Sequence, residues 1–424
     1  MPGDRDVFRA PIGTHDVLPP ESDRWQALVA SFAKRAGRAG FGMLMTPIFE
    51  HIEVVQKLGS TTDVVSKEMY DFDDKGGRHV ALRADGTASV ARAFAQHQPV
   101  TPWKVWYVAP NFRYERPQKG RYRQHWQVGV EVLGVDDPTV DVEVIALAHS
   151  FCRDDLGLRR TRLLVNSMGD AETRSRYRDV LLDYWRAHAS VLGDEITRAE
   201  ANPLRILDSK RDDWQDMIAA APQIGEHLTE QSASDFETVQ QGLHALNISF
   251  EIEPRLVRGL DYYTGTTFEF QSDALDGAQN GIGGGGRYDG LVEQMGGKPT
   301  PGIGFGIGIE RVLIACDGEG VFGAPTPAVD VFVIDIVGGI AGVTLVSELR
   351  AVGLSADRAY GSRSAKKQWS AADRAGARWG VMLGPRELAD GKVAVKDLVS
   401  GKQLEIARAD VAAWLQTRKD QTIR

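Results

Sequence analysis

A segment in which glycine occupies every second position sets the strongest limit on how this chain can fold. Between residues 302 and 309 the sequence alternates glycine with large apolar residues and reads GIGFGIGI. Because successive side chains of a β-strand point to opposite faces, this pattern predicts a strand with one apolar face and one bare face. A flexible linker would not keep such an alternation. A bare face lets a flat group lie against the backbone, and we expect a nucleotide base there.

Two neighbouring glycine motifs look like other nucleotide sites, but their surroundings do not fit. The run GIGGGG at 281–286 matches GxGxxG, yet no apolar strand precedes it and RYDG follows where a helix should begin. Gly297 and Lys298 are followed by Pro299 instead of serine or threonine, so this is not a P-loop. The sequence therefore predicts neither a dinucleotide fingerprint nor a P-loop.

Arg311 lies at the start of a predicted helix, directly after the glycine-alternating strand. The helix dipole disfavours a cation at that position by about 0.3–1 kcal/mol. An anion between the helix start and the guanidinium reverses this effect, because both groups attract it. We interpret Arg311 as part of a phosphate site.

A basic segment at 111–123, NFRYERPQKGRYR, supports the same interpretation. Such a run is often only a solvated face, but this one carries interleaved aromatic residues that a solvated loop does not need. Several arginines fall at predicted strand ends, namely Arg113, Arg121, Arg123 and Arg258. Together with Arg311 they suit a triphosphate better than a single phosphate.

The order of predicted elements indicates two domains. Residues 22–39 read as a helix with Ser22 or Asp23 as its cap, and short strands follow one another in the manner of an antiparallel sheet. Residues 168–245 read as a helical insertion, because strands resume after them. The segment 323–330 has the composition of a linker, and the remainder alternates as a small α/β domain.

Charge and composition exclude several classes of protein. The 424 residues have a net charge of −8, which argues against a nonspecific nucleic-acid coater, although residues 328–424 alone carry +4. Cys152 and Cys316 are far apart, which excludes a disulfide scaffold, and without a CxxC pair we expect no structural zinc. No apolar run reaches the roughly 18 residues of a membrane span, and the N-terminus lacks a signal-peptide core. We expect a cytoplasmic protein without membrane attachment.

Several motifs, in order along the chain, resemble those of one enzyme family. FRYERPQKGRYRQHWQVGVEVLG resembles motif 2 of the class II aminoacyl-tRNA synthetases, GIGFGIGIERV resembles motif 3, and FGMLMTPIFE resembles motif 1. LVRGLDYYTGTTFEF and GGGRYDGLVEQMGG are similar to the histidine-specific signatures of the histidyl-tRNA synthetases. NPLRILDSK and SRSAKKQWSAADRAGA resemble the same family, so the likeness covers nearly the whole chain.

This resemblance implies a fold and an activity. The implied fold is α+β, with a class II catalytic domain over 1–325 built on an antiparallel sheet flanked by helices, a helical insertion at about 168–245, and an α/β anticodon-binding domain over 328–424. The implied enzyme is a histidine–tRNA ligase. It activates L-histidine with ATP and Mg²⁺ to histidyl-adenylate and pyrophosphate, then transfers histidine to the 3′ end of tRNA(His). Motif 1 implies a homodimer.

The resemblance also implies roles for individual residues. The catalytic pair would be Arg113 and Arg258, which flank the α-phosphate, with Arg113 also holding the histidine carboxylate. The ATP-binding residues would be Arg113, Glu115, Arg121, Tyr122 and Arg311, with Arg311 at the γ-phosphate. The tRNA acceptor end would be contacted by Arg116 and Gln118. We expect no dedicated metal site, because the ATP phosphates would hold most of the Mg²⁺ coordination.

Histidine recognition requires a hydrogen-bond donor and an acceptor, because a neutral imidazole offers one N–H and one bare nitrogen. Glu131 and Tyr263 could supply this pair, with Tyr262 beside them. The remaining histidine-binding residues would be Asp85, Thr87, Arg113, Gln127 and Arg258. The family often has PEGT where this chain has ADGT at 84–87, so the carboxylate of Asp85 is one methylene shorter. Asp261 is expected to be a supporting carboxylate instead of a catalytic one.

One alternative comes from a different class of protein. The inactive, synthetase-like regulatory subunit of ATP phosphoribosyltransferase shares the catalytic fold, but typically lacks the C-terminal domain and has eroded signatures. Here the signature residues and the C-terminal domain are both present, which favours the enzyme. A synthetase-like sensor of uncharged tRNA would need a fused effector domain, and this sequence contains none.

Overall fold

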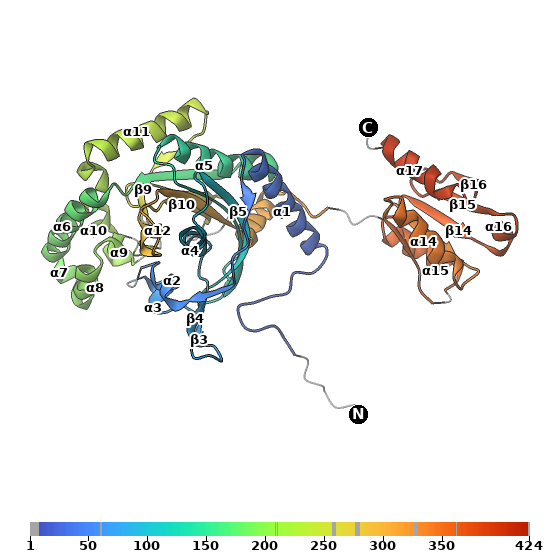
Figure 1. Ribbon diagram of the computed structural model, residues 1–424, viewed down its shortest axis with the longest axis horizontal. Coiled ribbons are helices and arrows are strands. Elements are labelled where there is room, and N and C mark those ends of the chain that lie inside the picture. The colour runs from blue at the N-terminus through green and yellow to red at the C-terminus, as the bar shows by residue number, and fades with distance from the viewer. Residues whose placement is uncertain are drawn as a thin grey trace. The chain divides into compact units, whose positions relative to one another are not determined.

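The computed structural model separates the chain into two compact units, Met1–Gly323 and Ala324–Arg424 (Figure 1). It describes residues 8–422 except 60–61, 208, 210, 257–259, 276–279, 326–328 and 362. Arg258, one of the two predicted catalytic residues, therefore lies outside the described residues.

The first unit is built on an eight-stranded sheet with the strand order β1-β5-β6-β11-β10-β9-β7-β8. In that order the strands are β1 Gly42–Met43, β5 Trp103–Phe112, β6 Gln124–Leu133, β11 Gly302–Gly308, β10 Gly281–Arg287, β9 Thr264–Ser272, β7 Thr161–Ser167 and β8 Glu251–Ile252. All inner pairs are antiparallel, as predicted, whereas β1 and β8 pair with their neighbours in parallel. The run GIGGGG lies in β10, so it is part of a strand and neither a linker nor a dinucleotide loop.

The apolar face of the glycine-alternating strand forms the centre of the core. Ile303, Phe305 and Ile307 of β11 are buried, as the period-2 pattern predicts. Phe305 meets Phe32 of helix α1 (Glu21–Arg38) edge-on, with 6.1 Å between ring centroids. Each fully buried side chain of this size stabilises the fold by roughly 1.5–3 kcal/mol. Helix α5 (Thr139–Ser150) and helix α13 (Ile309–Glu319) complete this core.

The predicted cap of the first helix is wrong. The residue before α1 is Pro20, and no side chain caps the helix, so neither Ser22 nor Asp23 has the predicted role. Instead, α1 begins one residue before Ser22, directly after Pro20, and Glu21 and Asp23 fall in its first turn. There their charges complement the helix dipole.

A second, smaller sheet lies beside the first. Its strands have the order β2-β4-β3, with β2 Phe49–His51, β4 His79–Leu82 and β3 Asp71–Asp73. The helices associated with this part of the unit are α2 Ile52–Gln56, α3 Asp63–Ser66, α4 Thr87–His97 and α12 Leu291–Gln294. Its core includes Phe94, Tyr107 and Tyr288.

Helices fill the stretch where the sequence predicts an insertion. They are α6 Ala171–Ala187, α7 Ala189–Leu192, α8 Ile196–Ala201, α9 Leu204–Leu207, α10 Gln215–Ala219 and α11 Glu230–Ala245. Trp185 and Trp214 belong to a hydrophobic core of the insertion itself. In Figure 1, α6 to α10 gather beside the large sheet while α11 runs along α5.

The second unit is a five-stranded sheet with the order β13-β12-β14-β15-β16. The strands are β12 Val331–Asp335, β13 Ala356–Arg358, β14 Trp379–Leu383, β15 Lys392–Asp397 and β16 Gln403–Ala407, and the helices are α14 Ala341–Ala351, α15 Ala365–Arg374, α16 Pro385–Ala389 and α17 Val411–Thr422. Strand β12 is parallel to both of its neighbours, and the later pairs are antiparallel. This is the predicted α/β arrangement. Within the described residues, no helix of either unit is long and apolar enough to cross a membrane.

Candidate active site

A cavity of 720 Å³ lies in the first unit, over the part of the large sheet where glycines on β10 and β11 face each other. This volume is within the usual range for small-molecule sites. Its walls come from strands β5 to β11, the starts of α4 and α13, and the segments around residues 85, 120, 255 and 262. The predicted residues that line it are Asp85, Thr87, Arg113, Glu115, Arg121, Tyr122, Gln127, Tyr262, Tyr263 and Arg311.

One end of the cavity carries three arginines, Arg113, Arg121 and Arg311, and we call it the arginine end. Arg113 directly follows β5 and donates from Nε to the carbonyl of Ala84 at 3.0 Å. Arg121 leaves a turn in which Gly120 has a φ of +74°, and it pairs with Glu115. Arg311 lies in the first turn of α13, as predicted.

The arginine end is electrostatically prepared for an anion. Burial lowers the pKa of Arg121 and Arg311, and the neighbouring guanidinium of Arg113 or Arg121 lowers each further. Arginine stays protonated in proteins, so these lowered values mean that the positive charges repel one another in a partly dehydrated site. A polyphosphate placed among them would relieve that repulsion and form charge-assisted hydrogen bonds.

His125 of β6 also lines the arginine end, although it is not among the site residues predicted from the sequence. Burial, together with the positive charges of Arg113, Arg121 and Arg311, lowers its pKa to about 3. The ring is therefore neutral at physiological pH. The signal available in the sequence was its position four residues after Arg121, at the start of a strand whose other residues include Gln127 and Glu131.

The other end of the cavity is rich in tyrosine. We use the name tyrosine end for the group formed by Asp85, Tyr107, Glu131, Tyr262, Tyr263 and Tyr288. The Tyr262 hydroxyl donates to Asp85 Oδ2 at 2.9 Å, and it lies 3.4 Å from the Tyr263 hydroxyl. The backbone N–H of Ala88 donates to Asp85 Oδ1 at 3.2 Å. Burial raises the pKa of Asp85, and these hydrogen bonds together with Arg113 oppose the rise.

Glu131 lies beneath the tyrosine end and is fully buried. Its Oε1 accepts from the hydroxyls of Thr87 at 2.7 Å and Tyr107 at 3.3 Å, and its Oε2 accepts from Tyr288 at 2.7 Å. Burial raises its pKa to about 8. Thr87 and Tyr107 line the cavity, whereas Glu131 does not, so two hydroxyls stand between this acid and the open space.

The chain is similar to known proteins over nearly its whole length. The family model described as histidyl-tRNA synthetase matches residues 13–312, and that described as anticodon binding domain matches residues 331–418. The chain is 49% identical over 404 residues to the histidine–tRNA ligase of Rhodococcus erythropolis, covering 94% of this chain and 95% of that one. The crystal structure of apo S. aureus histidyl-tRNA synthetase superposes with a TM-score of 0.82 at 34% identity, covering 97% of this chain and 100% of that one.

The chain belongs to the histidyl-tRNA synthetase family. The predicted family, class II fold and histidine–tRNA ligase activity are thereby confirmed. A Bacillus halodurans C structure named as an ATP phosphoribosyltransferase regulatory subunit/histidyl-tRNA synthetase also matches, with a TM-score of 0.60 at 21% identity, over 84% of this chain and 93% of that one. That likeness shows the fold alone.

Half of the bare face of β11 is covered by protein side chains, whereas the sequence predicted a flat ligand along it. A Cβ on Gly304 would lie 1.7 Å from Glu131 Oε2, and one on Gly302 would lie 2.3 Å from the ring of Tyr288. These two glycines make room for protein side chains, so no base can lie against them. Gly306 and Gly308 do line the cavity, and the expectation of a flat ligand stays a prediction for that half of the strand.

The other predicted residues of this histidyl-tRNA synthetase family member are also placed. Gln127 lines the cavity and accepts a hydrogen bond from Asn111 at 2.7 Å. Tyr122 lines the cavity, and its ring lies 4.4 Å from that of His15. Arg116 and Gln118 are exposed on the loop between β5 and β6. Arg258 lies outside the described residues, although Leu256 and Leu260 on either side of that gap line the cavity.

Proposed function

We propose that the 720 Å³ cavity binds ATP at its arginine end and histidine at its tyrosine end, with the reacting α-phosphate near Arg113. The observation that carries this assignment is the grouping of polar residues in one cavity. Arg113, Arg121 and Arg311 act on one another in one part of it, and a buried network of acids and hydroxyls adjoins them where Arg113 acts on Asp85. Arg162 and Arg255 also line the cavity. In-line attack of the histidine carboxylate on the α-phosphate needs positioned positive charge and no covalent nucleophile. The products of this step are histidyl-adenylate and pyrophosphate.

At the arginine end, Arg113 and Arg258 would act as the catalytic pair and hold the α-phosphate, while Arg311 would hold the γ-phosphate. Arg121, Glu115 and Tyr122 would complete the ATP site. Mg²⁺ enters with ATP as part of the substrate and would neutralise phosphate charge. Among the described residues, no three His, Cys, Asp or Glu side chains are grouped in a way that could hold a metal ion. We propose that the phosphates supply most Mg²⁺ ligands; Glu269 and Glu310 are among the carboxylates that line the cavity.

At the tyrosine end, Tyr263 would contact the imidazole directly. Glu131 would act from beneath, because its carboxylate fixes the hydroxyls of Thr87 and Tyr107 that line the cavity. Asp85 would receive the histidine ammonium, with Tyr262 holding the carboxylate in place. Gln127 would contact the neighbouring polar groups of the substrate.

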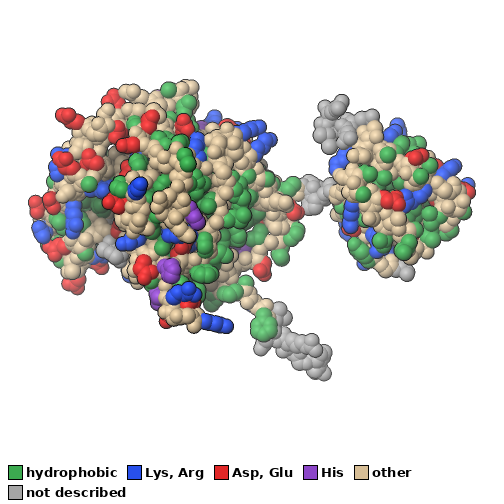
Figure 2. Space-filling model, viewed as in Figure 1, with side chains coloured by type: hydrophobic (Ala, Val, Ile, Leu, Met, Phe, Trp, Pro, Cys, Tyr) green, Lys and Arg blue, Asp and Glu red, His purple; other side chains and the backbone are tan. Residues whose placement is uncertain are grey.

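We propose that the second unit binds the anticodon region of tRNA(His). Because β12 and β13 are parallel, their carboxyl ends lie at one edge of the sheet. There Ile340 and Tyr360 are 79% and 63% exposed, and Arg358 lies over the Tyr360 ring at 4.8 Å. Three further basic side chains lie just before or at the start of α15, namely Arg363, Lys366 and Lys367. None of the three forms an ion pair with an acidic side chain among the described residues. Exposed aromatic and basic groups together suit unpaired bases and phosphates of RNA. On the face drawn in Figure 2, apolar and basic side chains both reach the surface of this unit.

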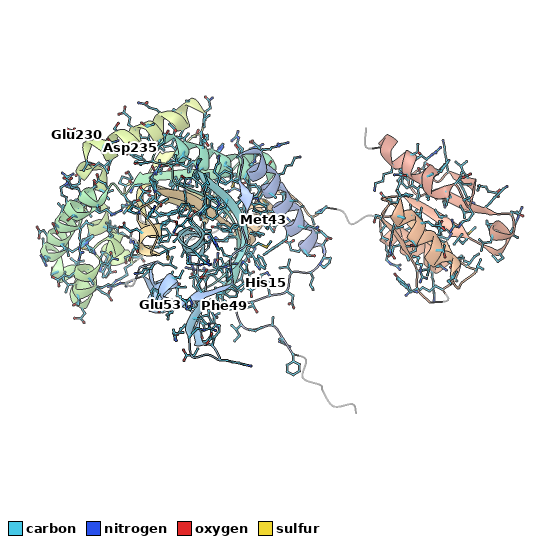
Figure 3. All side chains as sticks on the ribbon, in the orientation of Figure 1. His15, Met43, Phe49, Glu53, Glu230 and Asp235 are labelled. Carbon is cyan, nitrogen blue, oxygen red and sulfur yellow. The ribbon has the colours of Figure 1, made fainter. Side chains whose placement is uncertain are left out.

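The motif 2 loop and motif 1 supply two further proposals. Arg116 and Gln118, exposed beside the cavity, would contact the tRNA acceptor end. The motif 1 segment exposes several large apolar side chains, namely Met43, Met45, Ile48 and Phe49, and a homodimer would cover them. Figure 3 labels Met43 and Phe49. Sedimentation analysis should give a dimer for the natural chain and a smaller species for Phe49→Glu. A monomeric natural chain would contradict the dimer. The cytoplasmic location stays a prediction.

Pyrophosphate exchange into ATP, measured with each amino acid in turn, tests the activity. We expect exchange with histidine alone. Folded protein that shows no exchange with histidine would instead favour the regulatory-subunit alternative. In a second arm, the fragment 1–323 should retain histidine-dependent exchange, provided that circular dichroism shows it to be folded, but should charge tRNA poorly. Undiminished charging by that fragment would contradict the role of the second unit.

A further inference from the structure

The wall of the tyrosine end has the helical insertion behind it. Leu260 and Tyr263 line the 720 Å³ cavity, and the same two residues line a second cavity of 240 Å³. The far side of this second cavity is formed by the insertion, through Arg174 and Arg178 of α6 and residues 201–204. The backbone that presents Tyr263 to the substrate site therefore separates that site from the insertion.

Arg174 crosses this boundary. Its Nη1 donates to the backbone carbonyl of Tyr263 at 3.2 Å. Burial lowers the pKa of Arg174, while Asp170 and Asp289 nearby favour its charged form. A partly buried guanidinium needs hydrogen-bond acceptors, so this bond costs more to lose than one at the surface. Arg176, two residues later on the same helix, donates to the carbonyl of His227 at 3.1 Å instead, and that bond stays inside the insertion.

The start of α6 is well fixed, so it can act as a support. Asp170 caps the helix by accepting from the N–H of Thr173 at 2.7 Å and also accepts from the Thr229 hydroxyl at 2.6 Å. Thr229 in turn caps α11, so the first and last helices of the insertion are joined at their starts. Met168 and Gly169 pair with Gly265 through backbone hydrogen bonds of 2.6 and 2.9 Å. The link from α6 to Tyr263 is therefore short and rigid at its base.

We propose that Arg174 is a positioning residue for histidine, through which the helical insertion sets the backbone of Tyr263. This inference rests on the proposed histidine site and adds a role for the insertion. Arg174 does not touch the substrate, and its effect comes from fixing where the Tyr263 hydroxyl lies. A shift of the insertion, for example when RNA binds the enzyme, would then change the affinity for histidine.

The test compares Arg174→Met with Arg176→Met, because both changes remove an arginine–carbonyl hydrogen bond from α6. We expect Arg174→Met to raise the histidine KM in pyrophosphate exchange, and the histidine Kd by calorimetry, about tenfold or more. The ATP KM should change less than twofold, because the arginine end keeps all its groups. Arg174→Lys, which retains a donor, should recover part of the affinity. Arg176→Met should leave both KM values at the natural level.

Other outcomes would overturn the inference. A histidine Kd within twofold of the natural value in folded Arg174→Met would show that Arg174 does not set the site. Equal increases in both KM values, with a lowered Tm shared by Arg176→Met, would show a merely structural role for this helix. If Arg174→Met does not fold, Arg174→Lys and Arg174→Gln are measured instead. The glutamine side chain is too short to reach the Tyr263 carbonyl, so its histidine Kd should rise. A histidine Kd at the natural value in both variants would contradict the proposal. The natural enzyme serves as a separate control, because its failure to bind histidine would reject the proposed function itself and not only the role of Arg174.

Discussion

The two ends of the cavity treat charge in opposite ways. At the arginine end, Arg121 and Arg311 stay charged although burial and a neighbouring guanidinium lower the pKa of each. At the tyrosine end, Glu131 is an acid whose pKa is raised to about 8, and the tyrosines around it have pKa values raised well above their usual range. The arginine end thus presents positive charge to a polyanion. At the tyrosine end, Glu131 and the tyrosine hydroxyls form a nearly neutral network for an uncharged ring, beside the carboxylate of Asp85 that would meet the ammonium.

This difference has a physical reason in the substrates. A triphosphate is recognised by charge, and charge acts across a partly hydrated space without strict geometry. An imidazole is recognised by one hydrogen-bond donor and one acceptor of the protein. These two groups distinguish histidine from other amino acids only when they are buried, because another side chain would then leave them unpaired. We therefore expect changes at the arginine end to lower rates, and changes at the tyrosine end to lower selectivity and affinity for histidine.

The largest effect is expected for Arg258→Ala. A donor that faces the α-phosphate strengthens its contact as charge builds on the non-bridging oxygens, so it stabilises the transition state more than the ground state. Loss of one such donor typically costs about 3–4 kcal/mol, or roughly a hundredfold to a thousandfold in rate. We expect the rate of adenylate formation, measured by rapid-quench kinetics, to fall at least a hundredfold. The KM values for ATP and histidine should change much less.

The controls for Arg258 use the second half-reaction and a conservative change. Transfer of histidine from preformed adenylate to tRNA should be much less affected, since the phosphoanhydride has already been cleaved. Arg258→Lys should restore only part of the rate, because an ammonium cannot reproduce the planar fork. Equal damage to both half-reactions, with a lowered Tm, would instead indicate a structural arginine.

The next largest effect distinguishes two glycines on one strand. In Gly304→Ala the new methyl group would overlap Glu131 and approach the Val130 carbonyl to 2.4 Å, whereas at Gly308 the nearest atoms lie 3.8 Å away. Overpacking of this kind typically costs about 1–3 kcal/mol. We expect urea unfolding to show this loss for Gly304→Ala and less than about 0.5 kcal/mol for Gly308→Ala. Gly308→Ala should instead raise the ATP KM, because Gly308 lines the arginine end. Equal stability of the two variants would contradict the register described here.

The alternation at 302–309 predicts the strand, its apolar face and the neighbouring Arg311, because these follow from period 2 and from chain order. It cannot predict that Gly304 faces Glu131, because that depends on which strand becomes the neighbour and in which register. Tyr107 and Tyr288 were missed for the same reason. They are distant in sequence from Glu131, and only the pairing of β5 with β6, of β6 with β11 and of β11 with β10 brings them to it. The cap of α1 was predicted wrongly because local propensity does not decide between helix starts that lie one or two residues apart.

Glu131→Gln tests the tyrosine end at a moderate magnitude. The amide keeps the shape of the carboxyl group, but its NH₂ cannot accept, so at least one of the three hydroxyls loses its acceptor. An unmet buried partner costs about 1–3 kcal/mol, so we expect the histidine KM to rise about tenfold with little change in the ATP KM. Glu310→Gln, a buried carboxyl at the arginine end, should show the opposite pattern. Parallel changes in both KM values for both variants would remove the distinction between the ends.

The smallest effect is a pH dependence of stability that belongs mainly to buried acids. Burial raises the pKa of Glu131 to about 8, of Glu310 to about 7 and of Asp141 to about 6. Between their ordinary values and these raised values, the folded chain binds more protons than the unfolded chain. The free energy of unfolding must therefore fall as pH rises through this range. We expect the Tm to decrease from about pH 5.5 to pH 8.5 in scanning calorimetry, with a shallower decrease in Glu131→Gln, which has no proton to lose there. An unchanged slope in that variant would mean that Glu131 is already ionised in the folded chain, so that its carboxylate would add a negative charge to that of Asp85.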